Sequence, residues 1–394
     1  MAIDLVSLLA KAVQLGGSDL HLKVNSLPLV RIDGEIIPIA GTESVSEADV
    51  EAVLDIVTEK TPRRLAHFLD VGDLDTAYHA PAVGRFRVNG FRQRGSISFA
   101  FRYVPKEVPT IELLRLPDGV MRLAEEHRGL ILVTGATGSG KTTTLAAMLN
   151  RINSTRRQHI VTLEDPIEII HDDNLCAINQ REIGLDTESY EEGLRRVLRQ
   201  DPDVILIGEL RDEESARAAL QAGESGHLVL STLHTVDAME TIGRLIEFFP
   251  PTKQMLVRQV MASVLRGVIS QRLLPQIGGG RIAAVEVMIN SARIAEMIRE
   301  PLKTDAIPKA IEEGAVHEMQ SFMQHLVQLV LDGLVDRDVA ANAASNRHDF
   351  ELALQHALRS RQAAEQHRPV VESDLVTRPA LDVAPLNAIR SPAA

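Results

Sequence analysis

The sequence predicts an α/β protein of two domains, and three observations support this prediction. After residue 118, short apolar runs alternate with helical segments, which is typical of a parallel sheet covered by helices. Before residue 104, short segments alternate apolar and polar residues, which favours a small domain with antiparallel strands. Three prolines, Pro105, Pro109 and Pro117, lie between these parts and indicate a stiff extended connector outside either core. We therefore predict domains at residues 1–104 and 119–360, joined by a linker at 105–118.

Composition excludes several classes of protein. With 394 residues, 45% of them hydrophobic, the chain is long enough for two packed cores. Its net charge of −12 disfavours a general binder of nucleic acid or anionic lipid, and the single cysteine, Cys176, fits a reducing cytoplasm. The start does not resemble a secretory signal, and no apolar run reaches the roughly 18 residues of a membrane span. We expect a cytoplasmic protein without direct membrane insertion, which reaches a membrane through a partner.

The first domain should combine helices with small antiparallel strands. Residues 3–15 repeat apolar side chains at helical spacing and stop at Gly16, and residues 46–68 show the same periodicity with a new start or kink at Pro62. Residues 19–24, 29–32 and 35–39 are predicted as strands, and residues 85–103 as a hairpin that turns near Gly95. The prediction for this domain is therefore an α+β arrangement.

The second domain should hold a parallel sheet. Apolar strands are predicted at residues 130–134, 160–164, 204–208 and 228–232. Helices are predicted at 255–274 and 319–335, with a strand at 283–288 between them, so the C-terminal portion should be largely helical. Residues 361–394 contain four prolines, no glycine and no aromatic residue, which predicts a disordered tail.

A glycine-rich loop follows the first strand of the second domain and opens a helix. This is the context of a Walker A loop, in which backbone N–H groups and the helix N-terminus bind phosphates. Lys141 is expected to reach the β and γ phosphates of ATP, and the Thr142 hydroxyl to ligate Mg²⁺. The predicted ATP-binding residues are Gly135, Thr137, Gly138, Ser139, Gly140, Lys141, Thr142 and Thr143.

Two acids follow buried strands of the same predicted sheet. Glu209 comes after the apolar run 204–207 and Gly208, which is a Walker B pattern, and Glu164 ends the strand at 160–164. Because the carboxyl ends of parallel strands converge on one crevice, both side chains should face the bound phosphates. We expect Glu209 to activate water and Glu164 to support Mg²⁺ or water, with both acids near the metal. The simpler interpretation of either acid is a cap at a strand end.

Histidines and arginines supply further candidates. His227 and His234 stand at the entry and exit of the strand at 228–232, and His234 could sense the γ-phosphate. P-loop motors commonly need an arginine from across a subunit interface, and the second domain offers no obvious one of its own. Arg85 and Arg102 are therefore candidates in the first domain, together with Arg87 and Arg94, although most surface arginines only solubilise a protein.

Four ordered motifs together give the chain a family resemblance. They are the Walker A loop, the segment 162–168 as an Asp box, the segment 199–209 as Walker B, and the segment 226–235 as a His box; 17–22 and 84–89 also match. The chain resembles the secretion and pilus ATPase superfamily, and within it the PilT-type retraction ATPases of twitching motility. The resemblance implies a PAS-like N-terminal domain, a RecA-like ATPase domain and a homohexamer. It also implies an inner-membrane pilus platform protein as partner, and supports roles for Glu209, Glu164, His227 and His234.

The direction of force is the next question. Extension and export ATPases of the superfamily generally carry a four-cysteine zinc module, which one cysteine cannot build, so retraction is favoured. Retraction members usually read Ala-Ile-Arg-Asn-Leu-Ile-Arg-Glu where this chain has residues 293–300, and here Ala295 and Glu296 replace the arginine and the asparagine. This departure leaves open an accessory role of the PilU type, beside a paralogous pilus ATPase. A pilus-assembly or secretion ATPase, a RecA-like nucleic-acid translocase and a non-hydrolysing scaffold are less favoured functions.

Overall fold

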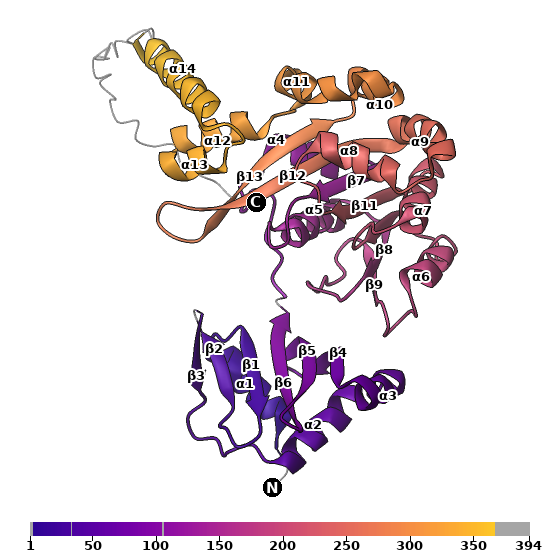
Figure 1. Ribbon diagram of the computed structural model, residues 1–394, viewed down its shortest axis with the longest axis vertical. Helices are drawn as coiled ribbons and strands as arrows, with labels where there is room; N and C mark the ends of the chain where they lie inside the picture. Colours follow the sequence, from indigo (N-terminus) through magenta and orange to yellow (C-terminus); the bar gives the residue numbers. More distant parts are fainter. Residues whose placement is uncertain (1–2, 33, 105, 367–394) are drawn as a thin grey trace, which may run out of the picture.

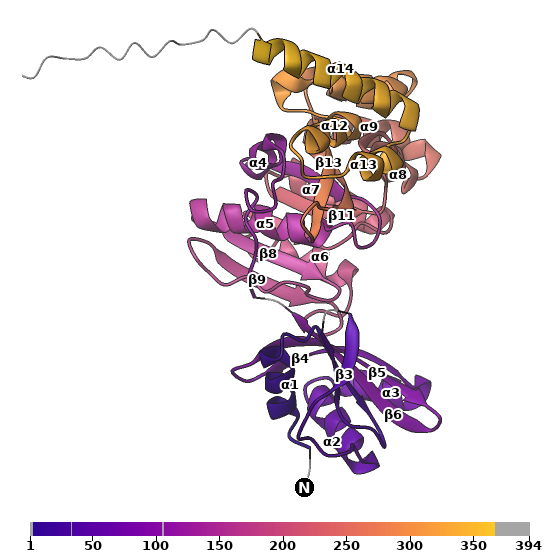
Figure 2. The ribbon, with the colours of Figure 1, turned by 90° about the vertical axis from the view of Figure 1, so that its left-hand side faces the viewer.

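The computed structural model describes residues 3–32, 34–104 and 106–366, and contains two sheets that each have their own hydrophobic core (Figure 1). Figure 2 shows the N-terminal sheet and its helices at one end of the elongated molecule and the larger sheet beyond them. No helix among the described residues is long and apolar enough to cross a membrane. The α/β class predicted from the sequence is confirmed.

The N-terminal part is a six-stranded antiparallel sheet, in the order β3-β2-β1-β6-β5-β4. Its elements are α1 (Leu5–Gln14), β1 (Asp19–Lys23), β2 (Leu29–Ile32), β3 (Glu35–Pro38), α2 (Glu47–Thr58), α3 (Pro62–Val71), β4 (Asp73–Ala80), β5 (Gly84–Gln93) and β6 (Ser96–Val104). A capping box at Ser46 starts α2, and Pro62 occupies the first turn of α3, where a missing N–H costs nothing. Buried side chains of α1, α2 and the strands form one cluster, so the helices cover a face of this sheet.

The second part is a seven-stranded sheet in the order β13-β12-β7-β11-β10-β8-β9, parallel except for β13. Its strands are β7 (Gly129–Thr134), β8 (His159–Glu164), β9 (Ala177–Glu182), β10 (Val204–Ile207), β11 (Leu228–Leu233), β12 (Leu265–Pro275) and β13 (Arg281–Ile289). Its helices are α4 (Asp118–Ala124), α5 (Lys141–Thr155), α6 (Tyr190–Val197), α7 (Glu213–Glu224), α8 (Ala238–Glu247) and α9 (Pro251–Val264). Because β7, β8, β10 and β11 run in one direction, their carboxyl ends meet at one edge of the sheet.

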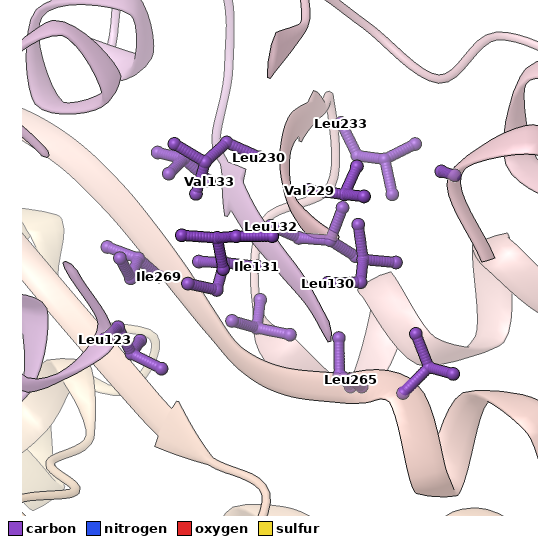
Figure 3. Packing of buried hydrophobic residues seen from close by; sticks show 14 of the residues in the cluster. Leu123, Leu130, Ile131, Leu132, Val133, Val229, Leu230, Leu233, Leu265 and Ile269 are labelled. Atoms are coloured by element: carbon purple, nitrogen blue, oxygen red, sulfur yellow. The ribbon is translucent and has the colours of Figure 1, made fainter. Parts of the chain in front are cut away.

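The core of this part forms where helices cover both faces of the central strands. Leu130, Leu132 and Val229 are buried between β7, β11 and the packed helices, and Leu265 and Ile269 extend the cluster along β12 (Figure 3). β7 and β11 are buried at every position, as expected for a parallel sheet covered on both faces. The rigid core therefore fixes the positions of the loops that follow β7, β10 and β11.

The C-terminal helices are α10 (Ala292–Arg299), α11 (Ile307–Glu312), α12 (Phe322–Leu331), α13 (Arg337–Ala343) and α14 (Arg347–Gln366). The last three pack together with the outer ends of β12 and β13 in a third hydrophobic cluster. The helical C-terminal portion was predicted, but α14 continues to Gln366, so the predicted disordered tail is wrong for residues 361–366. Residues 367–394 lie outside the described part of the chain.

Two further sequence predictions need correction. The helix predicted at residues 255–274 is wrong beyond Val264, because β12 begins at Leu265 and inserts between β7 and β13. When a segment is buried on both faces, its apolar residues show neither the period of a strand nor that of a helix, so the pattern cannot distinguish the two. The linker was expected outside either core, yet Ile111 and Leu116 are buried in the larger cluster, so its second half packs onto the second domain. Strands β4 and β9 were not predicted.

Candidate nucleotide-binding site

The glycine-rich loop leaves the carboxyl end of β7 and enters α5 at Lys141. Gly138 and Gly140 have φ of 78° and 91°, a left-handed conformation that glycine adopts without steric cost and that lets the loop curl. Thr137, Gly138, Gly140, Lys141, Thr142 and Thr143 line a cleft of about 640 Å³. Gly135 and Ser139, also predicted for the site, are not among its lining residues; they lie against β12. The loop thus presents backbone N–H groups and a helix N-terminus to the cleft.

Lys141 lies at the centre of this cleft with little solvent exposure. Its Nζ donates to the carbonyl oxygens of Gly135 at 2.7 Å and Ala136 at 3.1 Å, and lies 3.4 Å from Nδ1 of His234. Burial lowers the pKa of Lys141, while the nearby charge of Glu209 opposes that shift. A partly desolvated ammonium interacts more strongly with an anion than one in water does.

Glu209 and His234 meet at the carboxyl ends of β10 and β11. Oε1 of Glu209 is 3.3 Å from Nε2 of His234, so the imidazole lies between the carboxylate and Lys141. Oε2 of Glu209 accepts a hydrogen bond from Arg211 Nε at 3.1 Å. The adjacent Gly208 leaves no room for a side chain, because a Cβ there would lie 2.8 Å from the Tyr190 hydroxyl. The structure therefore brings both predicted residues into the cleft.

Glu164 ends β8 and also lines the cleft, although it is 7% exposed. Its Oε1 accepts hydrogen bonds from the Thr162 hydroxyl at 2.7 Å and from Gln180 Nε2 at 3.0 Å. Burial raises the pKa of this carboxyl, and the two hydrogen bonds act in the opposite direction. Glu164 is thus held rigidly, with one oxygen occupied by protein donors.

Known proteins are similar to this chain in sequence and in fold. Residues 114–336 match the family model described as Type II/IV secretion system protein. The chain is 42% identical over 349 residues to the type IV pilus retractation ATPase PilT of Pseudomonas aeruginosa, covering 88% of this chain and 100% of that protein. It is 36% identical to the type IV pilus ATPase PilU of the same organism, covering 89% and 91%.

A solved structure of the pilus retraction motor PilT with bound ADP superimposes with a TM-score of 0.81 and 41% identity, covering 89% of this chain and 99% of that one. The chain belongs to the Type II/IV secretion system protein family. The resemblance to PilT-type members that the four motifs indicated is confirmed.

Within this family member, the two histidines of the His box occupy opposite ends of β11. His227 precedes the strand, where its Nδ1 lies 3.0 Å from the Ser225 hydroxyl and 3.1 Å from the Ala222 carbonyl oxygen. In the parallel register of β11 and β7, Leu228 lies opposite Gly129 and Leu233 lies opposite Thr134. The P-loop, which follows Thr134, therefore lies at the end of β11 that is away from His227. The prediction that His227 shares the site is therefore corrected for a single subunit, because six residues of extended strand separate it from His234.

The predicted arginines of the N-terminal domain have different surroundings. Arg102 and Arg87 both line the cleft. The Nε atom of Arg102 also pairs with Asp19 Oδ1 at 2.8 Å. Arg85 is not among the lining residues, because its Nη2 pairs at 2.7 Å with Glu182, a buried carboxylate at the end of β9. Within one subunit, Arg85 therefore joins the two domains instead of facing the cleft.

Two arginines of the second domain were missed by sequence reasoning. Arg211 and Arg281 line the cleft, so the expectation that this domain offers no arginine of its own is wrong. Arg211 Nη1 is 3.5 Å from Asp165 Oδ2, and its guanidinium carbon is 5.7 Å from the centre of the Tyr190 ring. A cation two residues after the Walker B acid was the available signal for Arg211, whereas nothing in the sequence pointed to Arg281.

The residues present fit a Mg²⁺ ion that also contacts phosphate. The described residues include no group of three or more His, Cys, Asp or Glu side chains arranged to hold a metal alone. Magnesium in nucleotide sites needs only one or two protein oxygens, since phosphates and water complete its coordination. The Thr142 side chain, with Glu209 and Glu164, supplies such oxygens in one cleft.

Proposed function

We propose that this chain is a hexameric, ATP-hydrolysing motor that powers type IV pilus retraction. The observation that carries the proposal is the meeting of Lys141, His234 and Glu209 in one cleft of a chain that matches the whole length of PilT. A lysine that can bind phosphate and a carboxylate or amide that can orient water recur in enzymes that hydrolyse nucleoside triphosphates, and here the imidazole of His234 lies between two such groups.

Each residue of the cleft has a specific task in this proposal. The P-loop N–H groups and Lys141 bind the β and γ phosphates, and Glu209 orients and polarises the attacking water. His234 contacts the γ-phosphate and passes its presence or loss to Glu209, which it faces at 3.3 Å. Mg²⁺, held by Thr142 with Glu209 or Glu164, would neutralise phosphate charge. Glu164 is more deeply buried than Glu209, whose side chain is 25% exposed, so we assign the water to Glu209.

A second cavity, about 360 Å³ in volume, adjoins the P-loop and is the proposed site of the nucleobase. Its lining includes the connector residues 113–116, Gln271, Leu273 and Arg281 of the last two strands, and Gly140 and Thr143 of the phosphate cleft. Leucine side chains give it an apolar wall, which suits a flat heterocycle. The packed half of the connector therefore contributes to binding, and its movement would follow nucleotide exchange.

The proposed motor acts as a ring on the cytoplasmic face of the inner membrane. Its partners would be five further copies of the chain, an inner-membrane pilus platform protein and a paralogous pilus ATPase. Arginines of one subunit's N-terminal domain, among them Arg102 and Arg85, are proposed to complete a neighbour's site when the domains rotate. We further propose that the two domains meet in the connector predicted at residues 105–118, whose second half packs onto the second domain.

An accessory retraction ATPase of the PilU type is the second candidate function. The observation that favours it lies in α10, where Ala295 is buried and Glu296 pairs with Lys303 Nζ at 2.5 Å. Retraction members usually carry arginine and asparagine at these two positions, so this helix carries a different charge here. An accessory subunit would hydrolyse ATP but would retract pili only beside a paralogue.

Imaging of fluorescently labelled pili tests the proposal directly. Cells would carry Glu209→Gln as the only copy of the gene, and wild-type cells would serve as control. Pili that extend and accumulate without shortening are expected. Loss of pili would identify an extension motor, and unchanged retraction would show that another ATPase does this work. The accessory role would be supported if the wild-type chain retracts pili only when a paralogous ATPase is also present.

A further inference from the structure

The loop that binds phosphate is held from behind by a side chain of β12. Gln271, 1% exposed, donates a hydrogen bond from Nε2 to the backbone carbonyl oxygen of Ser139 at 2.7 Å, across 132 residues of sequence. We propose that Gln271 is a positioning residue that sets the phosphate-binding conformation of the P-loop, an inference that rests on the proposed function. Gln271 lies outside all four sequence motifs.

The peptide geometry explains how a bond to a carbonyl acts on phosphate. The Ser139–Gly140 peptide is trans, so its C=O and N–H point in opposite directions. With the Ser139 carbonyl drawn toward β12, the Gly140 N–H points away from β12, and Gly140 lines the phosphate cleft. Fixing the oxygen therefore fixes the direction of a donor that would bind phosphate.

The Ser139 carbonyl needs this partner because the helix does not supply one. The backbone hydrogen bond at the start of α5 runs from Thr144 N to Gly140 O at 3.0 Å, which leaves the Ser139 oxygen outside that bond. The orientation of the Gln271 amide is also determined. If the amide were flipped, Gln271 Oε1 would lie beside the Ser139 carbonyl oxygen, and two acceptors repel each other. The interaction is thus a directed donor to an acceptor that is buried beneath the loop.

Strand β12 is a rigid base for this contact. Ser270 accepts a hydrogen bond from the Thr134 hydroxyl at 2.8 Å, at the last residue of β7 before the loop. The Gln271 carbonyl oxygen would lie 2.4 Å from a Cβ on Gly135, so only glycine permits this close approach. On the other side, Arg272 Nη1 donates to the Ala343 carbonyl oxygen at 2.7 Å and anchors the strand to α13.

Two substitutions and a matched control test the role. Gln271→Met keeps the length of the side chain and removes the donor, and Gln271→Glu replaces the donor with an acceptor. Gln320→Met is the control, because Gln320 Nε2 donates to the Val285 carbonyl oxygen at 3.0 Å, and Val285 is the β13 partner of Gln271. The control thus loses a comparable bond on the same hairpin without touching the P-loop.

The measurement is equilibrium binding of ADP and of AMP to the purified full-length proteins, with thermal unfolding alongside. In Gln271→Met we expect the Kd for ADP to rise about five- to tenfold, the size of one buried hydrogen bond. The Kd for AMP should change less, because AMP lacks the β-phosphate that the loop binds. An equal rise in both constants would instead assign the effect to the nucleobase cavity, which Gln271 also lines. Gln320→Met should keep both constants at their wild-type values even if its unfolding temperature falls.

The outcomes separate this inference from the proposed function. Wild-type protein that does not bind ADP would refute the nucleotide site itself. Wild-type binding together with an unchanged ADP to AMP ratio in a folded Gln271 variant would overturn the role of Gln271. If Gln271→Met does not fold, Gln271→Glu gives the same test, since a carboxylate cannot donate to the Ser139 oxygen.

Discussion

Oε1 of Glu209 and Nε2 of His234 lie 3.3 Å apart, at the ends of two strands that neighbour each other in the sheet. The other imidazole nitrogen, Nδ1, lies 3.4 Å from Nζ of Lys141. His234 thus faces a carboxylate on one side and, on the other, the lysine that we propose binds phosphate. This arrangement connects the group proposed to bind phosphate with the group proposed to activate water.

Substitution of Glu209 by glutamine should separate binding from hydrolysis. The amide keeps the shape of the side chain but cannot polarise water, so kcat should fall about 10²- to 10⁴-fold while the Kd for ATP changes little. ATPase assays and nucleotide titration on purified protein would measure both. Glu213→Gln is the matched control, because Glu213 lies on α7 and pairs with Lys253 at 3.1 Å. Near-normal turnover in Glu209→Gln would refute the assignment.

The two histidines of the His box should differ in their effect on turnover. His234→Ala removes the group between Lys141 and Glu209, and we expect kcat to fall about 100-fold. His227→Ala breaks contacts at the far end of β11, so it should lower the unfolding temperature but leave kcat within a few-fold of wild type. An equal loss of kcat in both variants would show that His227 acts in a nucleotide site. Within one subunit His227 is too far from the cleft to do so.

Much of this site could be predicted from the sequence because its residues follow strand ends. Glu209, Glu164 and His234 each come at or just after the end of an apolar run, and parallel strands bring such positions to one edge. The Walker A loop carries its own glycine pattern. Fold class and ATPase function were therefore predictable from the sequence alone, and the family resemblance indicated the direction of force.

The remaining features depend on tertiary packing that no local pattern encodes. β12 inserts beside β7, and its apolar residues fit a helix as well as a buried strand, so the role of Gln271 could not be foreseen. Arg281 reaches the cleft from β13, more than a hundred residues after the P-loop. His227 was placed in the site because the motif pairs it with His234, whereas the strand register separates them.

The ion pair between Arg85 and Glu182 should stabilise the contact between the two domains. Glu182 is buried, and its Oε2 also accepts from Ile167 N at 3.2 Å. Arg85→Met would leave an uncompensated buried carboxylate, with an expected loss of about 3 kcal/mol in unfolding free energy. Adding Glu182→Gln should recover part of it, because an amide oxygen can still accept from Ile167. Chemical denaturation of the full chain would measure both variants.

An exposed ion pair across the same domains provides the control for Arg85. Arg63 and Glu188 form it, and solvent screens both charges, so Arg63→Ala should change stability little. If Arg85→Met were as harmless as Arg63→Ala, the pair would not contribute to the domain contact. Arg85 would then be free to act on a neighbouring subunit.

The stability of the protein in acid should depend on His325, a buried residue of α12. Its Nδ1 accepts a hydrogen bond from Val285 N at 2.8 Å, and burial lowers the pKa of His325 to about 4 from an ordinary value of 6.5. As pH falls from 6.5 toward 4, the unfolded chain takes up a proton that the folded chain does not, so stability decreases. The shift corresponds to at most about 3 kcal/mol for this residue.

His325→Asn should remove this dependence, because the asparagine oxygen can accept from Val285 but does not titrate. The quantity to measure is the difference in unfolding free energy between variant and wild type at each pH. Other groups cancel in that difference, including His171, whose pKa burial also lowers to about 4, and Glu286, whose pKa burial raises to about 7. The difference should shift in favour of the variant as pH falls from 7.5 to 4. A constant difference would mean that the pKa of His325 is the same in the folded and unfolded chains, as for an exposed histidine.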